Sequence, residues 1–245
     1  MDQSKKILII IPAYNEGNNI GKVIAEIKRN YPDFDLLVIN DGSRDNTSEV
    51  AKETGMATVI DLSYNLGIGA AVQTGFKYAK KHNYDIAMQF DGDGQHMVSE
   101  ISKVIYPVIN DETDCMIGSR FVEKLEGFNS YPVRRLGIQI FKWVSLLLIG
   151  QIIKDQTSGL RAFNKEIINF LSDYYPRDYP EPEVIILLGK NKFRIKETFT
   201  QMRERQGGIS SIPDYRGPYY MLKVLLSMFM AAIRERRKEE IKHDY

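Results

Sequence analysis

The chain has 245 residues, of which 43% are hydrophobic, and its 33 Lys and Arg against 32 Asp and Glu give a formal net charge of +1. The length allows one large domain or two small ones, and the hydrophobic content excludes a chain that is disordered throughout. The balanced charge argues against a general nucleic-acid-binding protein, because such proteins use excess positive charge to displace counterions. The single cysteine, Cys115, excludes a disulfide framework and a cysteine-based zinc site, and it fits a reducing, cytoplasmic setting.

The first half of the chain alternates between two hydrophobic periods. Apolar, β-branched runs predict strands, and the stretches between them repeat their apolar residues at helical spacing. Short connections between such elements predict right-handed crossovers and a mostly parallel sheet covered on both faces, which is the α/β class. The strands are expected at residues 6–11, 34–39, 57–62, 86–90 and 115–117, with a helix after each of the first four.

The second half is less regular. Residues 120–135 resemble a loop, because Gly127, Asn129 and Pro132 fall there. Helical patterns are expected at 136–153, 165–172 and 183–189, and a strand at 194–199. The simplest organisation is one α/β domain, residues 1–211, followed by a helical and basic extension, residues 212–245.

Two apolar stretches, residues 136–153 and 221–233, fall short of the ~20 apolar residues that a spanning helix needs. Both fit amphipathic helices that lie in a membrane interface, and the second is followed by a basic run suited to anionic lipids. The alternative is that they are buried or dimer-forming helices, since apolar helices usually belong to a core. Both interpretations stay open at this stage.

Polar side chains follow the predicted strands, at the edge where open parallel sheets bind ligands. Asp91 and Asp93 stand one residue apart after the fourth strand, in a glycine-rich turn. A turn through Gly92 would let both carboxylates face one cation, and such hard oxygen ligands suit Mg²⁺ or Mn²⁺ on a diphosphate. The alternative is an ordinary Asp-Gly turn, which is common at strand ends.

The order of motifs along the chain narrows these alternatives. Residues 12–16 (Pro-Ala-Tyr-Asn-Glu), 40–43 (Asn-Asp-Gly-Ser) and 91–96 (Asp-Gly-Asp-Gly-Gln-His) together resemble family-2 glycosyltransferases of the GT-A fold. Residues 118–120 (Gly-Ser-Arg), 155–161 (Asp-Gln-Thr-Ser-Gly-Leu-Arg) and 203–211 resemble the polyprenyl-phosphate branch, which includes the dolichyl-phosphate mannose synthases. The resemblance covers roughly residues 6–211, and the ordered set is specific although each motif alone is weak.

The resemblance implies roles on the donor side. Asp41 would hydrogen-bond the edge of a uracil or guanine ring, and Gly69 would let a helix start near the nucleotide sugar. Asp93 would act in catalysis with Asp91 by holding the metal on the diphosphate, where the ion neutralises charge on the leaving group. The full set implied for the nucleotide is Pro12, Tyr14, Glu16, Asp41, Gly69 and Asp91, and the set implied for the metal is Asp91, Asp93 and Gln95.

The resemblance also implies an acceptor side. Guanidinium groups suit a phosphate monoester, although a solvated surface cluster would look the same in sequence. Asp155 would be the catalytic acidic residue beside the acceptor, and it would position the nucleophile more than deprotonate it, since a phosphate monoester is already largely ionised near neutral pH. The arginines implied for the acceptor phosphate are Arg120, Arg134, Arg135, Arg161 and Arg205.

The resulting hypothesis is a metal-dependent, inverting hexosyltransferase that moves a sugar from a nucleotide sugar to a polyprenyl phosphate. We expect a UDP-sugar such as UDP-glucose, with GDP-mannose second, at the cytoplasmic face of a membrane. Help from a separate membrane protein and a homo-oligomeric state are left open, and nucleic acid is not expected as a partner. One alternative keeps the fold but uses a growing cell-wall or capsular glycan as acceptor. Another is a module that binds nucleotide sugars without turnover, which the presence of Asp91, Asp93 and Asp155 disfavours.

Overall fold

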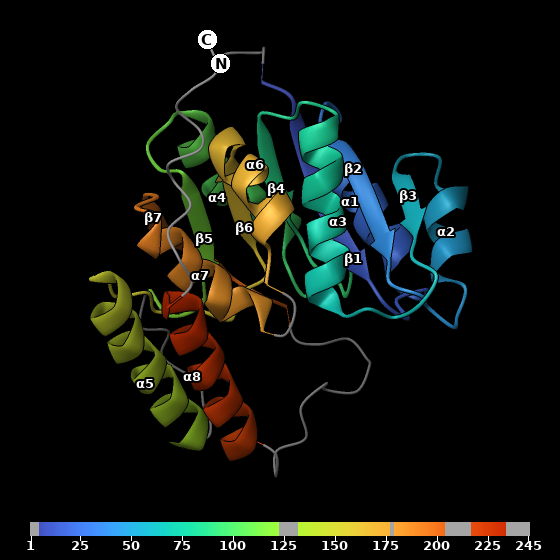
Figure 1. Ribbon diagram of the computed structural model, residues 1–245. Coiled ribbons are helices and arrows are strands. Elements are labelled where there is room, and N and C mark those ends of the chain that lie inside the picture. Colours follow the sequence, from blue (N-terminus) through green and yellow to red (C-terminus); the bar gives the residue numbers. More distant parts are fainter. Residues whose placement is uncertain (1–4, 123–131, 177–178, 204–216, 234–245) are drawn as a thin grey trace.

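The computed structural model describes residues 5–122, 132–176, 179–203 and 217–233. A seven-stranded sheet forms its centre, with helices on both faces (Figure 1). The strand order is β3-β2-β1-β4-β6-β5-β7. The strands are β1 Ile7–Ala13, β2 Asp35–Asn40, β3 Thr58–Asp61, β4 Ile86–Gln89, β5 Cys115–Ser119, β6 Arg161–Asn164 and β7 Ile195–Phe199. The helices are α1 Ile20–Asn30, α2 Thr47–Glu53, α3 Ile68–Lys81, the short η1 Val98–Glu100, α4 Ile101–Ile109, α5 Pro132–Ile149, α6 Lys165–Tyr174, α7 Pro180–Lys190 and α8 Gly217–Ile233.

The first four strands follow the expected pattern. β1 pairs in parallel with β2 on one side and with β4 on the other, and β2 pairs in parallel with β3. β1 is buried along nearly its whole length, which explains its continuous apolar sequence. The chain therefore reverses its winding direction between β1 and β4, and this switch point is where open α/β sheets bind ligands. The predicted α/β fold with a mostly parallel sheet is confirmed.

β6 is the strand that the sequence analysis did not predict. It lies between β4 and β5 and is antiparallel to both. An antiparallel strand begins at the edge where its parallel neighbours end, so Arg161 is the register partner of both Gln89 in β4 and Ile117 in β5. The residues that precede β6, including the stretch from Asp155, are thereby delivered to the carboxyl edge of the sheet.

Two apolar layers hold the helices to the sheet. On one face, α3, α6 and α7 pack on alternate residues of β1, β2 and β4, in a cluster that contains Ile10, Phe76, Phe163 and Leu171. On the other face, α1, α2 and α4 pack on the intervening residues, with Ile24 among them. Each central strand thus buries side chains on both faces, and the carboxyl edge of the sheet is left as the place where loops gather.

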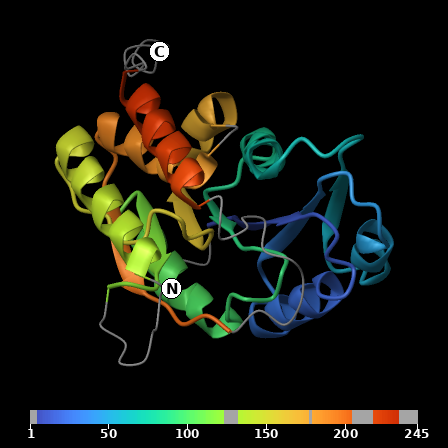
Figure 2. The ribbon, with the colours of Figure 1, turned by 90° about the horizontal axis from the view of Figure 1, so that it is seen from below.

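α5, α7 and α8 form a third apolar cluster beyond the main sheet, built from Phe141, Ile186, Val224, Met228 and Ala231. Figure 1 shows α5 and α8 side by side below the carboxyl edge of the sheet, and Figure 2 shows the same pair from below. No helix in the described ranges is both long enough and apolar enough to span a bilayer.

Two predicted boundaries in this region are wrong. The helix predicted at 136–153 ends at Ile149, because Gly150 takes a left-handed backbone conformation with φ of 71°. The loop predicted at 120–135 also ends earlier than expected, since residues from Pro132 onward are already helical. A proline suits the first turn of a helix, where its missing N–H is not needed, so Pro132 marks a helix start here and not a loop.

Candidate active site

The carboxyl edge of the sheet brings together the ends of its six parallel strands and the start of β6. Figure 2 looks onto this edge from below. The loop after β1 is hydrogen-bonded to the loop after β2, because Asn15 N donates to Ser43 Oγ at 2.9 Å and Glu16 N donates to Thr47 Oγ1 at 2.8 Å. Of the residues predicted to frame a nucleotide, Pro12 is half-buried at the end of β1 and Tyr14 is exposed beside it. The structure therefore places these predicted residues at the end of β1 and in a loop that is hydrogen-bonded to its neighbour.

Asp41 is buried and organises the loop that precedes α3. Its carboxylate accepts hydrogen bonds from Leu66 N at 2.8 Å and from Gly67 N at 2.9 Å. The next residue, Gly42, has φ of 65°, and a Cβ there would lie 2.6 Å from the backbone of Tyr64. Gly69 is buried in the first turn of α3. Asp41 thus has a visible structural task, and its predicted contact with a nucleobase stays a prediction.

The turn after β4 holds the two predicted metal-binding carboxylates. Asp91 Oδ2 lies 3.1 Å from His96 Nε2, and Asp91 Oδ1 accepts a long hydrogen bond of 3.4 Å from Gln89 Nε2. Asp93 Oδ1 accepts from Gln95 N at 2.9 Å, which closes the turn. Burial by itself raises the pKa of Asp91, but His96, Gln89 and the charge of Arg161 together lower it below its usual value. Asp91 is therefore ionised, and nearly a third of its side chain is exposed.

Gly159 contacts Asp91 from the opposite side. A Cβ at position 159 would lie 2.3 Å from Asp91 Oδ2, so only glycine leaves room for this carboxylate. Gly159 belongs to the segment before β6, and this contact places the two predicted motifs against each other. The sequence analysis identified the motif of residues 155–161, but only the structure shows that its glycine leaves room for the Asp91 carboxylate.

The donor set of this turn fits a hard divalent cation. Asp91, Asp93 and Gln95 carry side-chain oxygens within five consecutive residues, and oxygen ligands suit Mg²⁺ or Mn²⁺. Among the residues that the structure describes, no group of three or more His, Cys, Asp or Glu is arranged to enclose a metal. A cation here would therefore complete its shell with oxygens from water or from a bound phosphate, as Mg²⁺ commonly does.

Arg120 and Asp155 form a bidentate ion pair at the end of β5. Arg120 Nε donates to Asp155 Oδ2 at 2.7 Å, Arg120 Nη2 donates to Asp155 Oδ1 at 2.7 Å, and the backbone N of Arg120 adds a third bond at 3.0 Å. Asp155 is fully buried, which raises its pKa, yet the bonds and charge of Arg120 outweigh burial and lower it overall. Asp155 is thus held ionised in one orientation, while the Arg120 side chain keeps 18% of its surface exposed.

Glu197 in β7 supports this pair from behind. Its carboxylate accepts from Asp155 N at 2.8 Å and from Lys154 N at 2.7 Å. The sequence analysis did not select Glu197, and its only sequence signal is a charged residue inside a predicted strand. The segment that carries Asp155 is therefore fixed at both its backbone and its side chain.

Arg161 lies in a different place from the one that its predicted role requires. Its side chain is only 2% exposed, Nη1 donates to the backbone O of Glu181 at 2.8 Å, and Nη2 donates to the backbone O of Gln156 at 2.9 Å. A guanidinium group used in this way joins two segments of the protein. The side chains of Arg134 and Arg135 in α5 and all of Arg205 lie outside the described part of the structure, so their predicted contacts with phosphate stay predictions.

The chain after β7 returns to the turn of Asp91 and Asp93. Arg203 N donates to Gln95 O at 2.8 Å, and Met202 forms an isolated antiparallel bridge with His96. The Arg203 guanidinium pairs with Glu26 in α1 at 2.7 Å, so this side chain is anchored to a helix. The segment from Met202 to Arg203 is thereby tied directly to the turn of Asp91 and Asp93.

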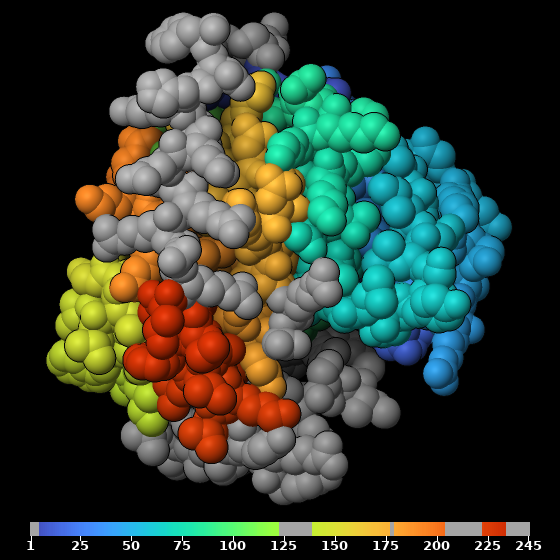
Figure 3. All heavy atoms as spheres, viewed as in Figure 1, coloured from blue at the N-terminus to red at the C-terminus, as the bar shows by residue number. Residues whose placement is uncertain are grey.

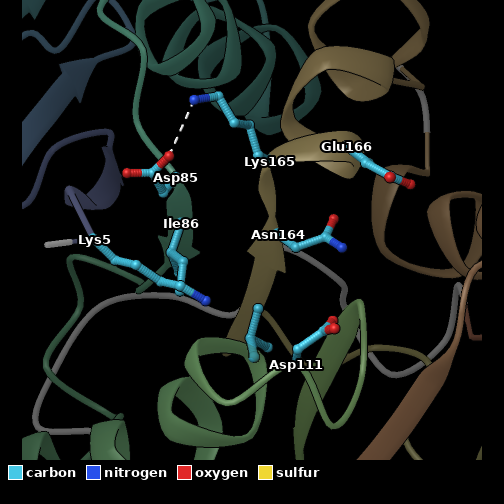
Figure 4. Close-up of a pocket in the computed structure, with 8 residues that line it drawn as sticks. Lys5, Asp85, Ile86, Asp111, Asn164, Lys165 and Glu166 are labelled. Atoms are coloured by element: carbon cyan, nitrogen blue, oxygen red, sulfur yellow. Dashed lines mark hydrogen bonds and ion pairs between the residues drawn. The ribbon is translucent and has the colours of Figure 1, made fainter. Parts of the chain in front are cut away.

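A hollow of about 350 Å³ lies at the opposite, amino edge of the sheet. Figure 4 shows Lys5, Asp85, Asn164 and Lys165 around it, with an ion pair of 3.0 Å between Lys165 and Asp85. Its charges are of both signs, and none of the residues predicted for the site lines it. The hollow is therefore not the candidate active site described above.

Comparisons with known proteins identify the family and the fold. The family model described as glycosyl transferase family 2 matches residues 8–171. A UDP-N-acetylglucosamine–dolichyl-phosphate N-acetylglucosaminyltransferase of Methanococcus voltae is 35% identical, over 79% of this chain and 84% of that protein. A polyprenol monophosphomannose synthase of Mycolicibacterium smegmatis is 31% identical, over 67% of this chain and 64% of that protein.

Among solved structures, glucosyl-3-phosphoglycerate synthase from Mycobacterium tuberculosis, crystallised with Mn²⁺, UDP-glucose and phosphoglyceric acid, superposes with a TM-score of 0.68. The superposition covers 94% of this chain and 80% of that one at 15% identity, and it confirms the GT-A fold. The family match spans the turn of Asp91 and Asp93, Arg120, Asp155 and β6. The predicted resemblance is thus confirmed, and the chain is a glycosyltransferase that belongs to glycosyl transferase family 2.

Proposed function

We propose that this glycosyltransferase transfers one sugar from a nucleotide sugar to a polyprenyl phosphate at a membrane surface, with inversion at the anomeric carbon and with a bound divalent cation. The observation that carries the proposal is the contact between two parts of the site, the turn that holds Asp91 and the segment that holds Asp155. Gly159 packs on Asp91, and the same segment carries Asp155, which is paired with Arg120. The segment of residues 155–159 thereby joins the turn of Asp91 to the Arg120–Asp155 ion pair, and this supports a donor side and an acceptor side within one site.

The names of the relatives support the class of acceptor. The Methanococcus voltae relative acts on dolichyl phosphate by its name, and the Mycolicibacterium smegmatis relative is a polyprenol monophosphomannose synthase. The donors implied by these names differ, so the sugar and the base are the least constrained part of the proposal. We place a UDP-sugar first and GDP-mannose second.

Asp91 and Asp93, with Gln95, would hold the cation, which neutralises charge on the departing nucleoside diphosphate. Arg120 would face the acceptor phosphate with its exposed atoms while its pairing with Asp155 keeps the guanidinium in place. Asp155 would orient the acceptor through Arg120, and it need not take a proton, because the acceptor phosphate is already largely ionised near pH 7. A direct in-line displacement by the phosphate oxygen at the anomeric carbon would invert its configuration.

The surface of α5 and α8 supports a position on a membrane. These helices bury one face in their shared cluster and expose large apolar side chains on the other. Figure 3 shows α8 as a continuous strip on the outside of the molecule with α5 beside it. Side chains of this kind can enter the boundary between lipid headgroups and acyl chains. The exposed apolar residues are Trp143 and Leu147 in α5, and Leu222, Leu226, Phe229, Met230 and Ile233 in α8.

The activity is tested by measuring release of nucleoside diphosphate from UDP-sugars and GDP-mannose, with a short polyprenyl phosphate, with unphosphorylated polyprenol and with a free oligosaccharide. We expect a product only with the polyprenyl phosphate, and we expect EDTA or Asp93→Ala to remove turnover while the circular dichroism spectrum is unchanged. A product only with the oligosaccharide would establish the glycan acceptor in place of the lipid phosphate. Full activity in EDTA would remove the metal from the proposal.

The membrane position is tested separately with vesicles that contain anionic lipid. We expect Phe229→Glu to reduce vesicle binding at least tenfold, because a charge on this face opposes burial among acyl chains. The matched control is Met56→Glu, which places the same charge on an exposed apolar residue between α2 and β3, at the other end of the sheet from α5 and α8 (Figure 1). Equal binding by both variants and the unaltered protein would contradict a role for this face.

A further inference from the structure

Residues 155–158 present one exposed side chain beside Arg120. Gln156 and Ser158 are buried, and their side chains donate hydrogen bonds of 2.6 Å to backbone carbonyl oxygens of other segments. Thr157 stands between them and is exposed. The segment is thus held on both sides of Thr157, while the Thr157 side chain itself remains accessible to a ligand.

Both carboxylate oxygens of Asp155 are occupied. Oδ2 accepts from the backbone N and from Nε of Arg120, at 3.0 and 2.7 Å. Oδ1 accepts from Arg120 Nη2 at 2.7 Å and lies 3.3 Å from Thr157 Oγ1. The Asp155 side chain has an exposed fraction of 0%, whereas that of Arg120 is 18%. A ligand that reaches this ion pair therefore meets Arg120 and Thr157, and not Asp155 itself.

The hydrogen bonds of this pair leave two donor groups for a ligand. Arg120 Nη2 uses both of its hydrogens, one on Asp155 Oδ1 and one on Thr157 Oγ1 at 2.8 Å. Among the residues that the structure describes, none accepts a hydrogen bond from Arg120 Nη1. Since Thr157 Oγ1 accepts from Nη2, its own hydrogen can be donated. Its contact with Asp155 Oδ1, at 3.3 Å, is longer than an ordinary O–H···O hydrogen bond.

Two neighbouring donors, one of them charged, suit the oxygens of a phosphate monoester. We propose that the Thr157 hydroxyl donates a hydrogen bond to the acceptor phosphate beside Arg120 Nη1, and that Thr157 is thus a further acceptor-binding residue. Thr157 stands two residues before Gly159, which packs on Asp91, so the phosphate would be held on the segment that reaches the donor side. This assignment rests on the proposed function, since it requires a phosphate as acceptor.

The competing explanation is that Thr157 serves only as a support for the Arg120 guanidinium. Thr157→Val keeps the shape of the side chain and removes the hydroxyl, so it would affect the acceptor under both explanations. A double-mutant cycle with Arg120→Lys separates them. If Thr157 acts only through the guanidinium, its loss adds nothing once the guanidinium is gone. If Thr157 donates to the phosphate directly, its loss weakens the acceptor in both backgrounds.

The test measures product formation with the preferred donor over a titration of farnesyl phosphate, a short polyprenyl phosphate. For Thr157→Val we expect the KM for farnesyl phosphate to rise about ten- to hundredfold, because a hydrogen bond to a charged group is lost. The KM for the donor and the slow release of nucleoside diphosphate without acceptor should stay within about twofold. Thr157→Ser keeps the hydroxyl and should stay within about threefold of the unaltered protein. In the Arg120→Lys background, Thr157→Val should still raise this KM about fivefold or more.

Two control variants accompany the series. Thr58→Val makes the same change at an exposed threonine at the amino end of β3, and it should leave the KM for farnesyl phosphate unaltered. Ser158→Ala removes the buried neighbouring hydroxyl, and it should lower Tm by about 2–4 °C, the effect of about 1 kcal/mol in a protein of this size. Thr157→Val should change Tm by less than about 2 °C, because its side chain is exposed.

The outcomes separate the two claims. If the unaltered protein transfers no sugar to farnesyl phosphate, the proposed function fails, and the inference fails with it. If the unaltered protein is active and the KM of Thr157→Val stays within about threefold, the inference alone is overturned. It is also overturned if Thr157→Ser weakens the acceptor as much as Thr157→Val, or if Thr157→Val has no further effect in the Arg120→Lys background.

Discussion

Replacement of Gly159 by alanine tests the contact between the two halves of the site. The added Cβ would lie 2.3 Å from Asp91 Oδ2 and 2.6 Å from Asp91 Oδ1, whereas ordinary contacts begin near 3.4 Å. The carboxylate would therefore have to move by about 1 Å, which breaks its present geometry with His96. Metal–ligand distances tolerate changes of only about 0.2 Å, and a misplacement of about 1 Å in a catalytic site can cost ~10²-fold in rate.

We expect Gly159→Ala to lower kcat/KM about a hundredfold and to raise the Mn²⁺ concentration needed for half-maximal activity. The assay is nucleoside diphosphate release over a titration of Mn²⁺, with Tm measured in parallel to show that the fold persists. The control is Gly21→Ala in α1, where the new Cβ would meet a single atom within 4 Å, the Cγ1 of Val50 at 3.0 Å, and no site residue. If the activity of Gly159→Ala and its response to Mn²⁺ stay within threefold of the unaltered protein, the contact of Gly159 with Asp91 does not position this carboxylate.

Two further predictions concern buried groups. Asp155→Asn should cost about 3 kcal/mol of unfolding free energy at pH 7, since it leaves the Arg120 guanidinium without its charged partner. Because the folded-state pKa of Asp155 lies below the usual 3.8, this stabilisation is complete above about pH 4 and is lost as the pH falls through the lower value. Urea titrations at pH 7, 5 and 3 should show the difference in unfolding free energy between the unaltered protein and Asp155→Asn becoming smaller at the lowest pH. A difference that does not change with pH would refute the assignment. The buried Cys115 thiol, whose pKa burial raises to about 12, should react with a thiol reagent only on unfolding, and prompt reaction in native buffer would be inconsistent with its place in β5.

The sequence was sufficient for the parts of the site that depend on strand ends. Parallel strands with short connections place their carboxyl ends on one edge, so Asp41, Asp91 and Arg120 were predicted to share that edge, and the parallel strands that precede them all end there. The sequence analysis assigned Asp155 to the site only because its segment resembles a known motif. Its physical reason is β6, whose antiparallel direction brings the residues before it to that edge.

Local patterns could not reveal β6 or the contacts that depend on it. The strand has four residues and begins with a buried arginine, so neither its length nor its polarity stands out. The hydrogen bonds from Leu66 and Gly67 to Asp41 join residues 25 and 26 positions apart, and no local period predicts such a pairing. The contact of Gly159 with Asp91 is of the same kind. Long-range contacts of this sort set the roles of individual side chains after the fold has placed them.

Arg161 is the residue for which sequence and structure suggest different roles, and one substitution separates them. If Arg161 bound the acceptor phosphate, Arg161→Lys would keep the charge, raise the acceptor KM and leave stability nearly unchanged. If it joins Gln156 to Glu181 through two carbonyl oxygens, a lysine ammonium cannot reproduce both bonds, since it lacks the planar fork of a guanidinium. We expect the second result, with a loss of about 2 kcal/mol in unfolding free energy, the value of one charge-assisted hydrogen bond. The same change at the partly exposed Arg120 should raise the acceptor KM instead. Unaltered stability of Arg161→Lys together with a weaker affinity for the acceptor would show that the buried contacts are not what Arg161 contributes.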